Sequence, residues 1–206
     1  MSRAKSVPSH HAGRPAADLP PRERILAAAR ELFYARGIRA VSVDEIAAAA
    51  DTNKMTLYRH FESKDRLVAE YLRSVAAEAD GFWEQVALAH PHDARKQLEA
   101  WMQKLSKGLA DPANRGCALA NAAVEIPEKD HPAREVIEHH QRSQRDHIAR
   151  LCRDAGFSGP DKLADEIFLL LEGARVNMQS MGPGGPCHRM PELFRMLLNS
   201  RTTNPA

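Results

Sequence analysis

Apolar positions recur every three to four residues from about residue 20 to about residue 200, and this spacing predicts amphipathic helices throughout. No stretch alternates apolar and polar residues in the way that a half-buried strand requires. Proline, glycine and N-capping residues divide the pattern into separate segments. We therefore expect an all-α fold of about nine helices.

Between residues 42 and 61 the pattern predicts two short helices joined by a tight turn. Ser42 is a good N-cap for the first helix, and Glu45 three residues later completes a capping box. Asp51 suits the turn because aspartate tolerates left-handed backbone, and Asn53 is expected to cap the second helix. The second helix turns its apolar side inward, so cations, hydroxyls and an aromatic ring crowd its outer surface.

This helical pair matches the pattern of a DNA-binding helix-turn-helix. A helix fits the major groove, where residues near its N-terminus reach base edges, while neighbouring hydroxyls and cations hold phosphates. The preceding helix, predicted over residues 21–36 and closed by Gly37, has a buried stripe suited to supporting the pair. The pattern therefore favours binding to double-stranded DNA over the alternative of a helical hairpin with a solvated charged face.

The rest of the chain is predicted to form further helices. They cover residues 63–89, 94–109, 117–126, 133–155, 162–180 and 191–200, with a glycine-rich break at residues 181–186. The first of them is long enough to belong to both halves of the molecule. The last two carry more apolar surface than the terminal helices of a small monomer need, which indicates a homodimer formed through them.

Composition narrows the class of protein. With 43% hydrophobic and 27% charged residues among 206, the chain has the make-up of an ordinary soluble globular protein. Its net charge is only +2, so affinity for nucleic acid must come from local clusters of cations. No apolar run is long enough to span a membrane, and the N-terminus lacks the apolar core of a signal peptide. We expect a cytoplasmic location without membrane contact.

These patterns divide the chain into three regions. Residues 1–19 hold proline, serine, histidine and basic residues without periodicity, so they are expected to form a disordered basic tail. Residues 20–66 form the predicted helix-turn-helix domain. Residues 67–206 are expected to form a helical domain that binds a ligand and dimerises.

The C-terminal helices hold residues suited to a small-molecule pocket. Pockets are mostly apolar with a few convergent polar groups. The candidates are Phe82, Trp83 and Trp101 for the walls, with Cys117, Asn121, Glu125, His140 and Gln144 beside them. For each residue taken alone, a satisfied position in the core or on the surface is the competing interpretation.

Cys117 supports a second hypothesis. It stands at the predicted start of a helix, where the helix dipole lowers the pKa of a thiol, and Arg115 precedes it by two residues. Such a cysteine could sense oxidants or electrophiles, and a buried inert thiol is the alternative. The three cysteines of the chain are widely spaced, which fits reduced thiols better than disulfides.

The sequence has no evident catalytic or metal-binding pattern. His139, His140 and His147 do not reproduce a zinc-ligand spacing, and no CxxC motif occurs. A glycine-rich phosphate loop would have to follow a strand, and no strand is predicted. We therefore predict that the protein is not an enzyme and needs neither a cofactor nor a metal.

From Arg22 to Leu67 the chain resembles the DNA-binding domain of the tetracycline-repressor (TetR) family of bacterial regulators. The residues that carry the resemblance are Ile25, Ala29, Leu32, Phe33, Gly37, Ile46, Ala47, Ala50, Thr56, Leu57, Tyr58, His60, Phe61, Ser63 and Lys64. The turn departs from the family pattern. The family usually has glycine and then valine where this chain has Asp51 and Thr52.

The resemblance implies a dimeric regulator, most simply a repressor, that leaves a palindromic operator when a small molecule binds. In the family the long fourth helix links the two domains, and its tilt sets the separation of the DNA-reading helices. By the same resemblance, Lys54 and Met55 face base edges and Tyr58 contacts bases or a thymine methyl group. The phosphate contacts are Ser42, Thr56, Arg59, His60 and Lys64. The alternatives are an oxidant-sensing repressor acting through Cys117 and a helical interaction protein that binds protein or RNA.

Overall fold

The computed structural model describes residues 19–111 and 114–201. Its α-helices are α1 (Pro21–Arg36), α2 (Val43–Ala49), α3 (Lys54–Phe61), α4 (Lys64–Ala89), α5 (Ala94–Leu109), α6 (Ala118–Glu125), α7 (Pro132–Asp154), α8 (Pro160–Met181) and α9 (Met190–Asn199). A 3-10 turn, η2 (Pro186–Arg189), precedes the last of them. The described residues contain no strand, so the all-α prediction with nine helices is confirmed.

Local signals placed the helix ends within about two residues of the observed ones, and two features differ. The tail predicted over residues 1–19 lies, except for its last residue, outside the described part of the chain. The predicted break at 181–186 ends in the 3-10 turn η2, which begins at Pro186. Proline suits this position because a first helical residue has no use for its N–H group. None of the helices between residues 19 and 201 is long and apolar enough to cross a membrane.

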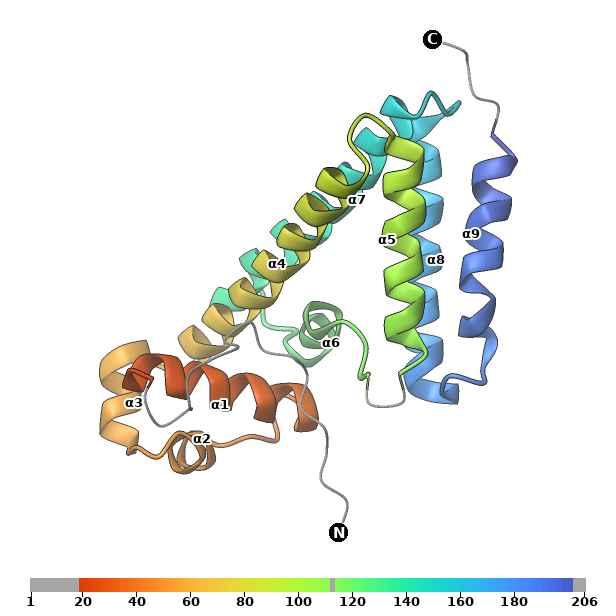
Figure 1. The fold of residues 1–206 in the computed structure, drawn as a ribbon. Helices are drawn as coiled ribbons and strands as arrows, with labels where there is room; N and C mark the ends of the chain where they lie inside the picture. Colours follow the sequence, from red (N-terminus) through yellow and green to blue (C-terminus); the bar gives the residue numbers. More distant parts are fainter. Residues whose placement is uncertain (1–18, 112–113, 202–206) are drawn as a thin grey trace.

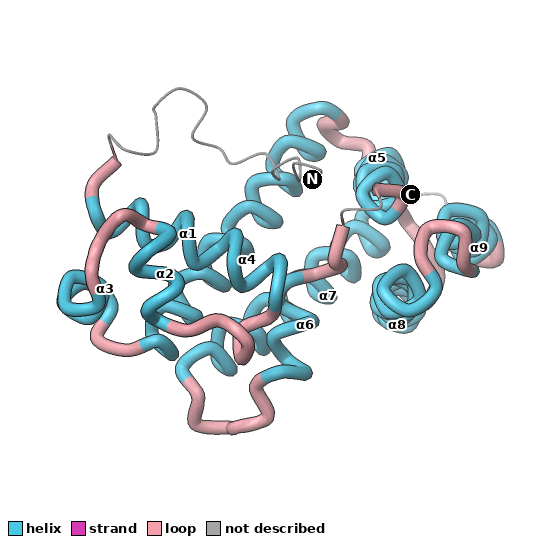
Figure 2. The backbone as a smooth tube through the Cα atoms, turned by 90° about the horizontal axis from the view of Figure 1, so that it is seen from below, coloured by secondary structure: helices cyan, strands magenta, loops and turns pink. Residues whose placement is uncertain are grey.

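The helices form two unequal groups joined by α4 and α7 (Figure 1). Helices α1, α2 and α3 lie at one end, and α4 runs from them diagonally through the molecule with α7 packed against it. Helices α5, α8 and α9 stand together at the other end, while α6 lies between the two groups. Figure 2, from below, shows α3 and the α8–α9 pair at opposite extremes of the molecule.

The first hydrophobic core fills the space between α1, α2, α3 and the start of α4. Its centre includes Ile25, Ile46, Leu57 and Leu67, which have no exposed surface. Helix α6 and the start of α7 complete this core with Leu119, Ala122, Ile126, Ala133 and Ile137. The core therefore extends across the domain boundary that we predicted after residue 66.

The second core joins the end of α4 to α5, α7, α8, η2 and α9. Trp83 packs face to face with Trp101, with ring centroids 4.7 Å apart, and His147 stacks on Trp83 at 4.2 Å. Stacked rings at this spacing add to the stability that their burial provides. Because α4 contributes Leu72 to the first core and Trp83 to the second, it ties the two ends of the molecule together.

Candidate nucleic-acid interface

A capping box and an ion pair stabilise the start of helix α2. The Ser42 hydroxyl accepts a hydrogen bond from the Glu45 N–H at 3.2 Å, and the Ser42 N–H donates to the Glu45 carboxylate at 2.8 Å. Arg36 at the end of α1 pairs with the same carboxylate at 2.7 Å. These contacts lower the pKa of Glu45 to about 2, with the backbone hydrogen bond from Ser42 as the largest cause. The predicted capping box is confirmed.

The turn between α2 and α3 has the left-handed residue that the sequence predicted. Asp51 has φ 48°, a conformation that glycine adopts freely and that aspartate tolerates better than most residues. Its carbonyl accepts a hydrogen bond from the Arg24 guanidinium of α1 at 3.2 Å. The next N–H, that of Thr52, donates to the Ala47 carbonyl at 3.0 Å. The turn that differs from the family pattern is therefore closed by ordinary hydrogen bonds.

Helix α3 has one buried side and one exposed side. The Asn53 side chain caps it by accepting a hydrogen bond from the Thr56 N–H at 2.9 Å, as predicted. Leu57 and Phe61 point into the first core from successive turns and fix the rotation of the helix. The opposite side consequently faces solvent, at the end of the molecule farthest from α8 and α9 (Figures 1 and 2).

The residues predicted to read bases lie on this exposed side. The Met55 side chain is 81% exposed and Tyr58 is 39% exposed, so both are open to contact with a partner. The Lys54 ammonium is exposed and lies 3.3 Å from a carboxylate oxygen of Asp44 on α2. Such a surface ion pair contributes little stability, but it biases the direction of the lysine side chain.

The residues predicted to hold phosphates are less uniform. Ser42 and Arg59 are exposed, whereas Thr56 and His60 are half-buried. The Nε2 atom of His60 is buried without a hydrogen-bond partner among the described residues. A phosphate contact by this histidine would have to use its other ring nitrogen.

Lys64 has a different partner from the phosphate that we expected. Its ammonium donates a hydrogen bond to the Ile38 carbonyl at 2.7 Å and lies 5.9 Å from the centre of the Phe33 ring. The side chain is half-buried, and this burial lowers the pKa of the ammonium. Lys64 therefore holds α4 against the loop between α1 and α2, and its contact with a DNA phosphate, which would use another of its three N–H donors, stays a prediction.

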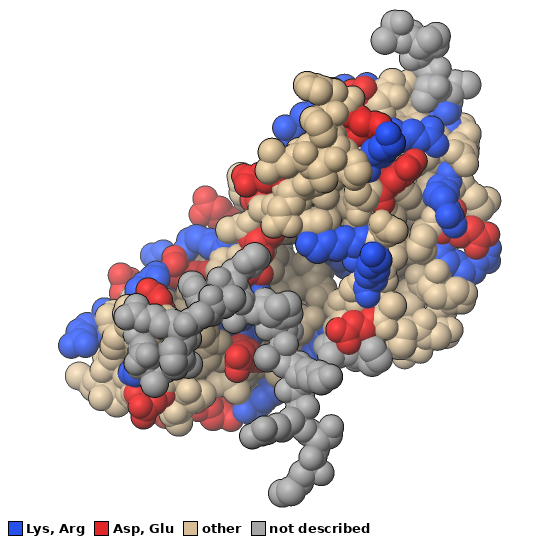
Figure 3. Space-filling view, viewed as in Figure 1, with Lys and Arg blue, Asp and Glu red and all other residues tan. Residues whose placement is uncertain are grey.

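The surface charge agrees with the small net charge of the sequence. On the face shown in Figure 3, Lys and Arg side chains are interspersed with Asp and Glu rather than gathered in one large patch. A DNA interface on α3 must therefore depend on a few well-placed groups, since no broad field on this face would draw in nucleic acid.

The residues predicted to form a ligand pocket do not meet in one place. Trp83 and Trp101 are buried in the second core, and the Trp83 indole N–H donates a hydrogen bond to the Gln144 side chain at 2.9 Å. Burial of an indole requires such a partner, so Gln144 satisfies a core tryptophan. The structure shows these three residues as satisfied parts of the second core, and their contact with a ligand stays a prediction.

Three other predicted pocket residues come from different segments, and Phe82 lies beside Trp83 with ring centroids 6.5 Å apart. Phe82 packs at the edge of the second core, with the Lys104 ammonium 3.7 Å from the centre of its ring. His140 is buried, and this desolvation lowers its pKa. Cys117 is the half-buried N-cap of α6 and packs against the first core.

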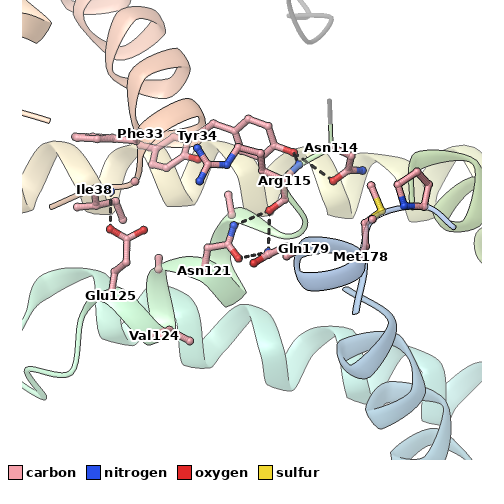
Figure 4. Close-up of a pocket in the computed structure, with 16 residues that line it drawn as sticks. Phe33, Tyr34, Ile38, Asn114, Arg115, Asn121, Val124, Glu125, Met178 and Gln179 are labelled. Atoms are coloured by element: carbon pink, nitrogen blue, oxygen red, sulfur yellow. Dashed lines mark hydrogen bonds between the residues drawn. The ribbon is translucent and has the colours of Figure 1, made fainter. Parts of the chain in front are cut away.

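Asn121 and Glu125 do line a cavity, which lies between α1, α6 and α8 (Figure 4). Its volume is about 620 Å³, within the range of small-molecule sites. Its other polar groups were not predicted, because they come from distant segments that only the fold brings together: Tyr34, Asn114, Arg115 and Gln179.

Glu125 also connects α6 to the helix-turn-helix region. Its carboxylate accepts hydrogen bonds from the Ile38 N–H at 2.7 Å and the Arg39 N–H at 3.1 Å, in the loop after α1. The Arg39 guanidinium in turn donates to the Glu125 carbonyl at 2.7 Å and pairs with Glu128 at 2.8 Å. We call this set of contacts the Glu125 clamp. It joins the end of α6 directly to the helix-turn-helix region.

Comparison with known families decides the class of the protein. Residues 25–71 match the family described as bacterial regulatory proteins, tetR family, and residues 94–194 match the tetracyclin repressor-like C-terminal domain. The chain belongs to the TetR family. It is thus a DNA-binding transcriptional regulator, and regulators of this family bind DNA as dimers and are not enzymes.

Relatives and solved structures agree with this assignment. The chain is 24% identical over 174 residues to the HTH-type transcriptional regulator YjdC of Escherichia coli K12, covering 83% of this chain and 91% of that protein. It is 39% identical over 79 residues to the HTH-type transcriptional repressor KstR2 of Rhodococcus jostii, and this match covers 38% of each chain. A TetR-family regulator from Streptomyces coelicolor has the same fold, with a TM-score of 0.76, 28% identity, and coverage of 87% of this chain and 93% of that one.

Proposed function

We propose that this TetR-family regulator is a repressor that binds a palindromic operator as a homodimer and releases it when a small molecule binds. The observation that carries the proposal is the exposed side of α3, where Lys54, Met55 and Tyr58 face solvent. On the opposite side of the helix, Leu57 and Phe61 are buried in the first core and fix its orientation. A rigid helix with a free outer side is what major-groove recognition requires. This proposal includes the assignment of residues 20–66 to DNA binding and of residues 67–206 to ligand binding and dimerisation.

Within the interface, each exposed group has a distinct proposed role. Lys54, Met55 and Tyr58 read base edges, and Met55 and Tyr58 suit apolar contact with thymine methyl groups. Ser42, Thr56 and Arg59 hold phosphates, together with His60 through its second ring nitrogen. Cytoplasmic location also belongs to the proposal, because the operator lies on the chromosome.

The exposed apolar surface of α8 and α9 supports a dimer. Leu169 and Val176 of α8 are 70% and 65% exposed, and the exposed Gly173 lies between them with open space beside it. On α9, Leu193 and Met196 are exposed as well. We call these residues the α8–α9 stripe. Twofold pairing of the stripe would bury it and place two copies of α3 on half-sites about 34 Å apart.

The effector part of the proposal is supported by the cavity between α1, α6 and α8. A molecule bound there would touch the DNA-binding helices and the helical domain together, because both contribute walls. Binding would favour one of two arrangements of the dimer, and the operator would be released if that arrangement no longer matched adjacent grooves.

Selection of bound sequences from a random duplex pool tests the proposal directly. We expect an enriched motif made of two inverted half-sites. The mass of the complex, measured by light scattering, should correspond to one dimer per duplex. Enrichment of a single half-site bound by one monomer would contradict the dimer, and the absence of any enriched motif would contradict sequence-specific DNA binding.

A further inference from the structure

The cavity between α1, α6 and α8 has one wall built from aromatic and apolar side chains. Phe33 and Tyr71 are buried with their ring centroids 5.6 Å apart, and Tyr34 continues this wall on α1. Ile38 and Met178 close the wall at its ends. A ligand that fits against such a wall must have a broad apolar surface, and a planar aromatic body supplies it with little conformational entropy to lose.

Next to Tyr34, the cavity edge is organised around the backbone of Arg115. Its carbonyl accepts hydrogen bonds from Asn121 at 2.8 Å and from Gln179 at 2.9 Å, and its N–H donates to the Tyr34 hydroxyl at 2.8 Å (Figure 4). Gln179 also donates to the Asn121 side-chain oxygen at 2.7 Å. Three helices therefore fix the main chain from which the Arg115 side chain extends.

Arg115 lines this cavity as an exposed residue, and its guanidinium has no acidic partner among the described residues. No hydrogen bond or ion pair to it is found in the described part of the chain, and Figure 4 shows the side chain extending past Tyr34 on the side of Phe33 and Ile38. The acidic residue of the cavity, Glu125, is already engaged, because its carboxylate accepts two backbone N–H groups in the Glu125 clamp. Arginine prefers carboxylates, which can accept two parallel N–H donors from one guanidinium.

We propose that this cavity binds a small planar aromatic carboxylate, with its ring on the Phe33 and Tyr34 wall and its carboxylate on Arg115. The proposal rests on the proposed ligand-responsive function and names the chemical class of the effector. A bound carboxylate would share the cavity with the Glu125 carboxylate, and repulsion between the two like charges would act on the Glu125 clamp. The signal would therefore reach the loop after α1 directly from α6, in addition to any change in the tilt of α4.

The test uses the full chain with 2-naphthoate as the probe and 2-naphthamide as its uncharged counterpart, each titrated by isothermal calorimetry. We expect the protein to bind 2-naphthoate about tenfold or more tightly than 2-naphthamide, because a charged hydrogen bond distinguishes the two. Arg115→Gln should remove this preference while leaving the affinity for 2-naphthamide unchanged. Ala118→Phe, which adds a ring to the cavity wall, should weaken binding of both probes.

Arg195→Gln is the matched control, because this exposed arginine lines a different groove, of about 820 Å³, between α5, η2 and α9. Equal affinity of the wild-type protein for the two probes, no binding of either, or a preference lost in Arg195→Gln and kept in Arg115→Gln would overturn the assignment. Operator affinity, measured in parallel with and without 2-naphthoate, separates the two proposals. Binding through Arg115 with unchanged operator affinity would support the site and contradict its role in release.

Discussion

The two ends of this molecule expose opposite kinds of helix surface. At one end, the outer side of α3 combines cations and hydroxyls with Met55 and Tyr58, and caps and ion pairs on α2 hold it in place. At the other end, the α8–α9 stripe is almost purely apolar. In the part of the chain that the structure describes, the apolar side chains on both surfaces are exposed. The two surfaces therefore suit different partners. The polar surface of α3 suits a hydrated polyanion such as DNA, and the α8–α9 stripe suits a second copy of itself.

The largest effect should come from the buried side of α3. Leu57→Ala removes a fully buried side chain from the first core, so we expect the free energy of unfolding to fall by about 2 to 5 kcal/mol. Met55→Ala on the exposed side of the same helix should change it by less than about 0.5 kcal/mol. Urea denaturation measures both. Similar losses in the two variants would mean that α3 does not have the two distinct sides described here.

The α8–α9 stripe is tested by placing charges on it. In Leu169→Glu combined with Val176→Glu, dimerisation would bury uncompensated carboxylates, so the dimer should weaken on the order of a hundredfold. Light scattering across a dilution series gives the mass of each species. Leu88→Glu is the control, since Leu88 of α4 is 82% exposed but lies off the stripe. A double variant that dimerised as well as the control would locate the interface elsewhere.

The polar surface of α3 should separate into two kinds of contact. Arg59→Ala should weaken binding to all duplexes alike and reduce the slope of log affinity against log salt by about 1. Lys54→Ala should cost about 1 to 3 kcal/mol on the selected operator and change the preference among sequences. Fluorescence anisotropy on selected and random duplexes distinguishes them. If Lys54→Ala weakened both duplexes equally, its assignment to base readout would be wrong.

The Glu125 clamp joins α6 to the loop after α1, so weakening it should loosen the attachment of α6 to the helix-turn-helix region. Glu125→Gln replaces a charged acceptor by a neutral one, and we expect a loss of about 1 kcal/mol in the free energy of unfolding. Amide exchange at Ile38 and Arg39 should accelerate, which hydrogen exchange read by NMR would show. Glu128→Gln, which changes only the exposed pair with Arg39, should leave the Ile38 amide unaffected.

The smallest effect concerns the cap of α2. The pKa of Glu45 is lowered to about 2 from an ordinary value of 4.5. A carboxylate whose pKa is lower in the folded state stabilises the fold fully above pH 4.5, and its contribution disappears as the pH falls from 4.5 to about 2. Thermal melts over this range should show a weaker pH dependence in Glu45→Gln. An unchanged pH dependence would mean that other carboxylates account for it.

The sequence was sufficient for features that depend on neighbours in the chain. Ser42 and Asn53 cap their helices as predicted, and Ser63 caps α4 in the same way, because each cap is completed within three residues. The left-handed Asp51 is local in the same sense. These short-range signals fixed the helix ends and the shape of the helix-turn-helix, which is the part of the site that was predicted best.

The features that sequence reasoning missed depend on contacts between distant segments. The Ile38 carbonyl that receives Lys64 lies 26 residues earlier in the chain, and the amides of the Glu125 clamp lie 86 and 87 residues from Glu125. Trp83 and Gln144 were correctly grouped, but the pattern could not distinguish a satisfied core from a ligand site. Burial, which depends on the whole fold, decides between these two interpretations.

The composition of the first core limits how this regulator can be divided. Helix α6 and the start of α7 supply Leu119, Ala122 and Ile126 to the same interior as the DNA-reading helices. A chimeric regulator that fused residues 19–66 to an unrelated sensor module would leave that interior open to water on one side. The helix-turn-helix domain therefore cannot be transferred alone. A chimera would have to include α6 for the domain to keep its shape.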